Sequence, residues 1–106
     1  MLIEVAKTGD IPEGDVRRVV ADRIEIALVN LGNGQFVAVD DICSHAESSL
    51  SEGEVDVDDE TIECARHGSI FDLRSGKPRS LPATLPIATF GVNVEGDAIL
   101  IELEDR

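Results

Sequence analysis

Short apolar segments separated by turn-forming residues run through the whole chain, and apolar positions at helical spacing are hard to find. Segments of this kind, punctuated by Gly, Pro, Asn and Asp, are typical of an all-β barrel or sandwich. The pattern therefore predicts an all-β fold. The strands expected first along the chain cover residues 2–6, 16–20, 23–31, 35–39, 54–57 and 61–63.

Turn signals lie between these strands. Gly32, Asn33 and Gly34 form a strong hairpin signal, because Asn and Gly tolerate a positive φ. Residues 10–14 and 58–59 read as further turns. A last hairpin is expected to turn at residues 96–97, between strands whose alternating apolar residues are Phe90, Val92, Val94, Ile99, Ile101 and Leu103.

Acidic and apolar residues alternate between Glu54 and Val57. Because successive side chains of a strand point to opposite faces, Val55 and Val57 are expected to face the core. Glu54 and Asp56 are then expected to face solvent.

Composition limits the possible functions. The 106 residues suit one domain, expected to cover residues 1–106, and 42% of them are hydrophobic. The formal net charge of −13 argues against nucleic acid and anionic lipid as partners. No signal-peptide pattern is seen in residues 1–7, and no apolar stretch approaches the roughly 20 residues that span a bilayer. We therefore expect a cytoplasmic protein that does not enter a membrane.

Both cysteines and both histidines of the chain lie in two short segments. Cys43 and His45 form a C-x-H motif, and Cys64 and His67 form a C-x-x-H motif. A single disulfide is disfavoured in a reducing cytoplasm, so metal binding is the better interpretation of the two cysteines. Both segments follow predicted strands, and neighbouring loops of a β-fold could bring them together.

A Cys₂His₂ set suits two kinds of metal site. Tetrahedral Zn²⁺ accepts these ligands, but zinc fingers usually group Cys with Cys and His with His around a helix. A [2Fe–2S] cluster can take both thiolates on one iron and both imidazoles on the other. Two loops that each supply one Cys and one His favour the cluster, and a structural zinc module remains the alternative.

The pattern C-x-H followed by C-x-x-H-G resembles the Rieske family. The likeness continues through S-I-F-D at 69–72, R-S-G-K-P at 74–78, P-A-T-L-P at 82–86 and V-E-G-D at 94–97. The chain is most similar to the ferredoxin components of bacterial ring-hydroxylating oxygenases. Ala46 and Arg66 depart from the family's usual residues, but neither replaces a ligand.

This resemblance implies a fold and a ligand set. The fold is an antiparallel Rieske β-sandwich or barrel with a cluster-binding subdomain at its tip. Cys43 and Cys64 would hold the buried ferric iron, and His45 and His67 the iron that is reduced. The proline-containing loop over residues 82–86 would cover one side of the cluster.

The resemblance also bears on the reduction potential. In high-potential members a Ser two residues after the second His donates a hydrogen bond to a bridging sulfide, and a Tyr two residues further on donates to a cysteine sulfur. This chain has Ser69 and Phe71 at these positions, and it lacks the additional disulfide of some high-potential members. We therefore expect Ser69 to contact the cofactor and the potential to lie at about −150 to +50 mV, the lower half of the Rieske range.

The implied function is that of a soluble, monomeric one-electron carrier, not an enzyme in its own right. It would pass electrons from a flavin-dependent NAD(P)H reductase to a terminal oxygenase. Service to another redox or Fe–S assembly system is an alternative, as is a protein like the small subunit of nitrite reductase.

Charge is unevenly distributed along the chain. Seven acids and no base lie between Glu52 and Glu63. Between residues 64 and 82 the only acid is Asp72, and we expect a less negative tip from the bases there, or simply a solvated face. These bases are Arg66, Arg74, Lys77 and Arg79.

Overall fold

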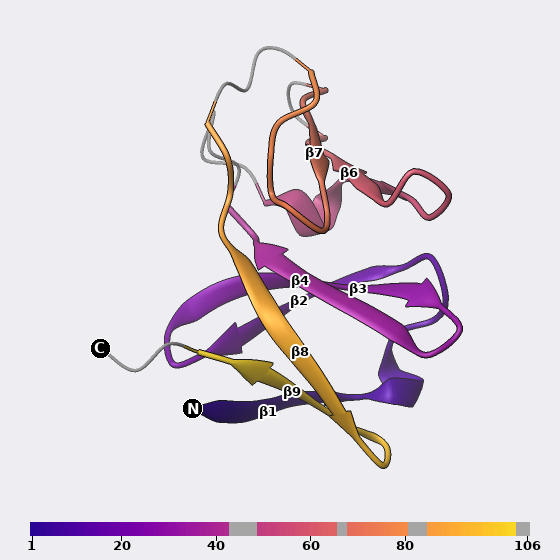
Figure 1. Ribbon diagram of the computed structural model, residues 1–106, viewed down its shortest axis with the longest axis vertical. Helices are drawn as coiled ribbons and strands as arrows, with labels where there is room; N and C mark the ends of the chain where they lie inside the picture. The colour runs from indigo at the N-terminus through magenta and orange to yellow at the C-terminus, as the bar shows by residue number, and fades with distance from the viewer. Residues whose placement is uncertain (43–48, 66–67, 81–84, 104–106) are drawn as a thin grey trace.

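Antiparallel strands form almost all of the secondary structure in the computed structural model, which describes residues 1–42, 49–65, 68–80 and 85–103 (Figure 1). Two 3₁₀ helices interrupt the strands. The elements are β1 (Leu2–Lys7), η1 (Thr8–Asp10), β2 (Val16–Ala21), β3 (Ile24–Gly32), β4 (Gln35–Asp40), η2 (Leu50–Glu52), β5 (Glu54–Asp56), β6 (Thr61–Glu63), β7 (Ile70–Asp72), β8 (Thr89–Glu95) and β9 (Ala98–Glu102).

The strands form a large sheet and a small one. The large sheet has the order β1-β9-β8-β4-β3-β2, and its edge strands β1 and β2 contact each other, so that it nearly closes into a barrel. The small sheet, β5-β6-β7, lies beyond one end of this barrel (Figure 1). The expected all-β antiparallel fold, with a separate subdomain at the tip, is confirmed.

The hairpin of β3 and β4 forms the wall between two hydrophobic cores. Ile26 and Leu28 of β3 face the interior of the barrel, whereas Ala27 and Val29 face the small sheet, and all of them are fully buried. We call the second cluster the tip core. It consists of Ala27, Val29, Leu31, Val37, Val39, Leu50, Ile62, Cys64, Phe71, Leu73 and Ile87.

The small sheet turns one face towards the tip core. Ile62 and Phe71 are fully buried and paired in register, and Val55, paired with Ile62, packs against them. Glu54 and Asp56 are exposed on the opposite face, as predicted. Val57 is half-buried but lies in the turn after β5, so the predicted strand ends one residue earlier.

Turn positions agree with the sequence prediction. Gly32, Asn33 and Gly34 have φ values of 91°, 55° and 76°, and they connect β3 to β4. The strand β7 and both 3₁₀ helices were not predicted from the sequence pattern. Within the described residues, no helix is both long and apolar enough to cross a bilayer.

Arg74 connects the small sheet to the barrel. Its Nη2 donates to Glu60 Oε2 and to Gln35 Oε1, each at 2.9 Å, and Gln35 begins β4. The basic side chain thus bridges the two sheets at the surface, above the apolar contacts of the tip core.

Gly76 allows the chain to approach itself closely beside the small sheet. Its N–H donates to Asp72 O and its carbonyl accepts from Ile87 N–H, both at 2.8 Å. Its φ is 76°, and a Cβ added there would lie 2.1 Å from the carbonyl oxygen of Ile87. Only glycine meets both demands without strain.

We therefore expect Gly76→Ala to destabilise the protein much more than Gly34→Ala. Gly34 has the same φ, but a Cβ there would meet nothing within 4 Å. Both variants carry the left-handed penalty of about 1–2 kcal/mol, and only Gly76→Ala adds an overpacking cost of about 1–3 kcal/mol. Urea unfolding of both variants measures this, and equal losses of stability would contradict the close approach.

Candidate metal centre

Two of the predicted cofactor-binding residues lie in the described part of the chain. Cys64 follows β6 directly, and Ser69 precedes β7. Both residues are fully buried, and Cys64 belongs to the tip core. The other predicted ligands, Cys43, His45 and His67, lie outside the described residues.

Backbone hydrogen bonds close the segment that carries the C-x-x-H motif. Cys64 N–H donates to Ser69 O at 2.7 Å, and Gly68 N–H donates to Cys64 O at 2.9 Å. Gly68 adopts a φ of 73°, which glycine reaches without strain. Cys64 and Ser69 are therefore held next to each other where β6 ends and β7 begins.

The segment that carries the C-x-H motif is closed at its base in a similar way. Ile42 and Ser49 form an antiparallel bridge on either side of it, and Leu50 N–H donates to Asp41 O at 2.6 Å. Leu50 then enters the tip core beside Cys64. The residues that flank the segment 43–48 are thus held together at the end of β4.

The stretch that follows the first motif and the stretch that precedes the second are in contact at Gly53. A Cβ added to Gly53 would lie 1.7 Å from the carbonyl oxygen of Glu63, the residue before Cys64. The chain leaving the first motif thus lies against the chain entering the second. The expected convergence of the two ligand-bearing loops themselves lies outside the described residues and stays a prediction.

The chain that leads into the proline-containing loop runs beside β7. Arg79 N–H donates to Ile70 O at 2.6 Å, and Ser80 Oγ accepts from Ile70 N–H at 3.0 Å. Leu85 is 63% exposed, and Pro86 is also exposed. The expectation that no central strand runs here agrees with these described residues, whereas the suggested cover by Pro82 lies outside them.

The described residues fit a cluster with cysteine ligands. A buried thiol at the base of a loop closed by backbone hydrogen bonds has the protection from water that a structural thiolate ligand needs. The two motif-bearing segments begin and end at one end of the molecule. The predicted Cys and His ligands of the two segments can therefore bind one metal centre.

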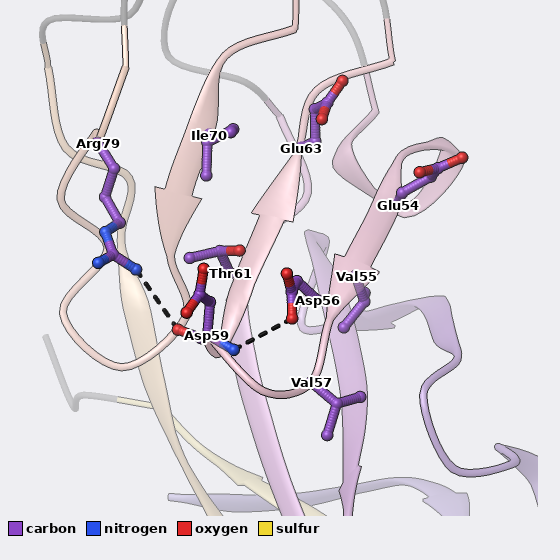
Figure 2. A pocket seen from close by; sticks show the side chains of 9 residues that line it. All are labelled: Glu54, Val55, Asp56, Val57, Asp59, Thr61, Glu63, Ile70 and Arg79. Atoms are coloured by element: carbon purple, nitrogen blue, oxygen red, sulfur yellow. Dashed lines mark hydrogen bonds between the residues drawn. The ribbon is translucent and has the colours of Figure 1, made fainter.

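An acidic groove of about 460 Å³ lies on the outer face of the small sheet (Figure 2). Glu54 stands directly opposite Glu63 in the β5–β6 pairing, and like charges in this position repel each other. Arg79 lies at the side of the groove, and its Nη1 donates to Asp59 O at 3.4 Å. The groove lining consists of Glu54, Val55, Asp56, Val57, Asp59, Thr61, Glu63, Ile70 and Arg79.

Some of the bases expected to make the tip less negative have acidic or polar partners nearby. The hydrogen bond from Arg74 lowers the pKa of Glu60, so this pair stays charged and largely cancels. Backbone hydrogen bonds from Ser75 and Arg74 lower the pKa of Asp72. The effect of these bases, which were expected to make the tip less negative, is therefore reduced within the fold.

Asp41 is a buried acid near the first motif that the sequence did not reveal. It is fully buried directly after β4, two residues before Cys43. An acid next to a predicted strand end usually lies in a solvated turn, so only the fold identifies this buried carboxylate.

Fold and site together define a class: small antiparallel β-proteins that hold a metal centre between loops at one end. The family model of the Rieske [2Fe-2S] domain matches residues 1–91. The chain therefore belongs to the Rieske family, and its cofactor is a Rieske-type [2Fe–2S] cluster.

Ferredoxins of oxygenase systems are among the similar proteins. The 3-phenylpropionate/cinnamic acid dioxygenase ferredoxin subunit of Escherichia coli (strain K12) is 44% identical over 103 residues, which cover 97% of this chain and 94% of that subunit. The ferredoxin of carbazole 1,9a-dioxygenase from Nocardioides aromaticivorans IC177 has a TM-score of 0.93 at 31% identity, covering 98% and 99% of the two chains. A complex of reduced oxygenase and oxidised ferredoxin in carbazole 1,9a-dioxygenase contains a chain with a TM-score of 0.86 at 34% identity, covering 97% of each chain.

Proposed function

We propose that this chain is the one-electron carrier of a ring-hydroxylating oxygenase system. It takes electrons from a flavin-dependent NAD(P)H reductase and passes them to a terminal oxygenase, which performs the catalysis. The observation that carries this proposal is the similarity, over 97% of the chain, to a dioxygenase ferredoxin subunit. The similarity to a ferredoxin in a complex with its oxygenase supports the oxygenase as partner.

Cys43, His45, Cys64 and His67 are proposed as the ligands, and Ser69 as a hydrogen-bond donor to the cofactor. The bound cluster supplies a site that gains and loses one electron, and imidazole ligands raise its potential above that of a four-cysteine cluster. Buried Cys64 excludes water from its side of the site. The backbone hydrogen bond from Cys64 N–H to Ser69 O holds these two residues next to each other.

The ligand assignment predicts the effect of removing either histidine. Purified wild-type protein should contain iron and acid-labile sulfide in equal amounts, with a Rieske EPR signal after reduction. His45→Ala or His67→Ala should abolish that signal, because each removes an imidazole from iron. Arg66→Ala changes a non-ligand within the same motif and serves as the control. A normal signal in either histidine variant, or zinc without sulfide in the wild type, would disprove the assignment.

The reduction potential should respond to Ser69 and Phe71. Ser69→Ala removes a buried hydroxyl that is proposed to stabilise the reduced, more negative cofactor, so the potential should fall by tens of millivolts. Phe71→Tyr should raise it, because Phe71 shares the tip core with Cys64 and a hydroxyl there could donate to sulfur. Voltammetry checks both shifts. Thr61→Val, which removes another buried hydroxyl, should leave the potential unchanged; an equal shift there would argue against a specific role for Ser69.

Electron transfer should depend on the acidic groove and on salt. The net charge of −13 attracts a basic partner surface, and salt screens this attraction over about 8–10 Å. Glu54→Gln with Glu63→Gln should slow reduction of the oxygenase at low salt by about threefold or more. The control pair, Glu95→Gln with Asp97→Asn, removes equal charge from the β8–β9 turn at the opposite end of the molecule (Figure 1). Stopped-flow rates that are alike for both pairs would show that the groove does not face the partner.

A further inference from the structure

Asp41 is the one Asp, Glu, Lys or Arg side chain that is buried among the described residues. Removing a carboxylate from water is costly unless hydrogen bonds and an opposite charge compensate it. Its position is therefore informative: it follows β4 and precedes Cys43 by two residues, at the point where the barrel ends and the metal centre begins.

Asp41 receives hydrogen bonds from the far side of the first motif segment. Its Oδ1 accepts Ser51 N–H at 2.8 Å, and its backbone carbonyl accepts Leu50 N–H at 2.6 Å. Its own N–H donates to Glu25 O of β3 at 3.0 Å. Asp41 thus joins Leu50 and Ser51, beyond the first motif, to the end of β4 and to β3.

The second carboxylate oxygen lies near a base on another strand. Asp41 Oδ2 is 3.6 Å from Nε of Arg18, and it accepts no hydrogen bond from the described residues. The guanidinium of Arg18 donates a hydrogen bond to Glu25, which holds it near Asp41. Arg18 is half exposed, so it compensates the buried charge from the surface of the barrel.

We propose that Asp41 is a positioning residue for the cluster: its carboxylate holds Ser51, which lies beyond the first motif, to the chain that enters this motif, and Arg18 compensates its charge. This inference rests on the proposed ligand set. A buried ion pair that served stability alone could be replaced by an apolar side chain at little cost. Asp41 differs from such an ion pair because its Oδ1 also accepts a hydrogen bond from Ser51 N–H, which lies beyond the first motif.

Two substitutions at Asp41 distinguish the role of its hydrogen-bond acceptor from the role of its negative charge. Asp41→Asn removes the charge and keeps an oxygen for Ser51 N–H, whereas Asp41→Leu removes both. Asp56→Leu is the control, because Asp56 Oδ1 also accepts backbone N–H groups, those of Asp58 and Asp59, but in an exposed turn. The rate at which the holoprotein loses its cluster to an iron chelator is measured from the bleaching of its visible absorbance. The reduction potential and the EPR g values are measured in parallel.

Cluster loss should be about tenfold or more faster in Asp41→Leu than in the wild type, and within about threefold of the wild type in Asp41→Asn. The potential should rise in both Asp41 variants, because each removes a negative charge close to the reducible site, and it should not change in Asp56→Leu. Cluster loss in Asp41→Leu no faster than in the control would overturn the proposal, as would equally fast loss in both Asp41 variants.

If Asp41→Leu does not fold, a second set of variants tests the same proposal. Arg18→Met leaves the buried charge uncompensated and should speed cluster loss, and adding Asp41→Asn should restore the wild-type rate. Absence of this rescue would also refute the proposal. Failure of the ligand assignment is recognised separately, because the wild-type protein itself would then lack the Rieske EPR signal.

Discussion

The β3–β4 hairpin is buried on both faces, and the remainder of the fold is arranged around it. Ile26 and Leu28 support the barrel core on one side, and Ala27 and Val29 support the tip core on the other. A polar residue at any of these positions would lose its contact with water in one core or the other. The small sheet depends on this wall most strongly, because strands of three residues have too few hydrogen bonds to be stable alone.

The first of the two predicted ligand motifs follows β4, where this wall ends. The described residues around the motifs are held by individual contacts between different parts of the chain, rather than by long elements of their own. Gly53 touches Glu63, Gly76 touches Ile87, and Asp41 holds Ser51. Contacts of this kind would keep the proposed ligands at fixed positions and would keep the structural change on electron transfer small.

Charge acts on this protein in two opposing ways. A strongly negative surface attracts a basic partner, but a nearby negative charge also disfavours the addition of an electron. The fold reduces this unfavourable effect of negative charge on the addition of an electron. Arg74 is bound to Glu60, Arg18 lies beside Asp41, and the opposed Glu54 and Glu63 are on the outer face of the small sheet, away from the tip core. Hydrogen bonds from groups such as Ser69 would act in the same direction by stabilising the reduced state.

Sequence alone determined the strands of the barrel, the turn at Gly32 to Gly34 and the family, because alternation, glycine and motif spacing are local signals that neighbouring residues carry. The paired Cys and His motifs identified the kind of metal centre for the same reason. The tertiary structure decided the rest. The strand β7 exists because β6 pairs with it, and Asp41 is buried because Arg18 and Ser51, distant in the chain, compensate it. Such features depend on which segments meet in space, and a linear pattern does not record that.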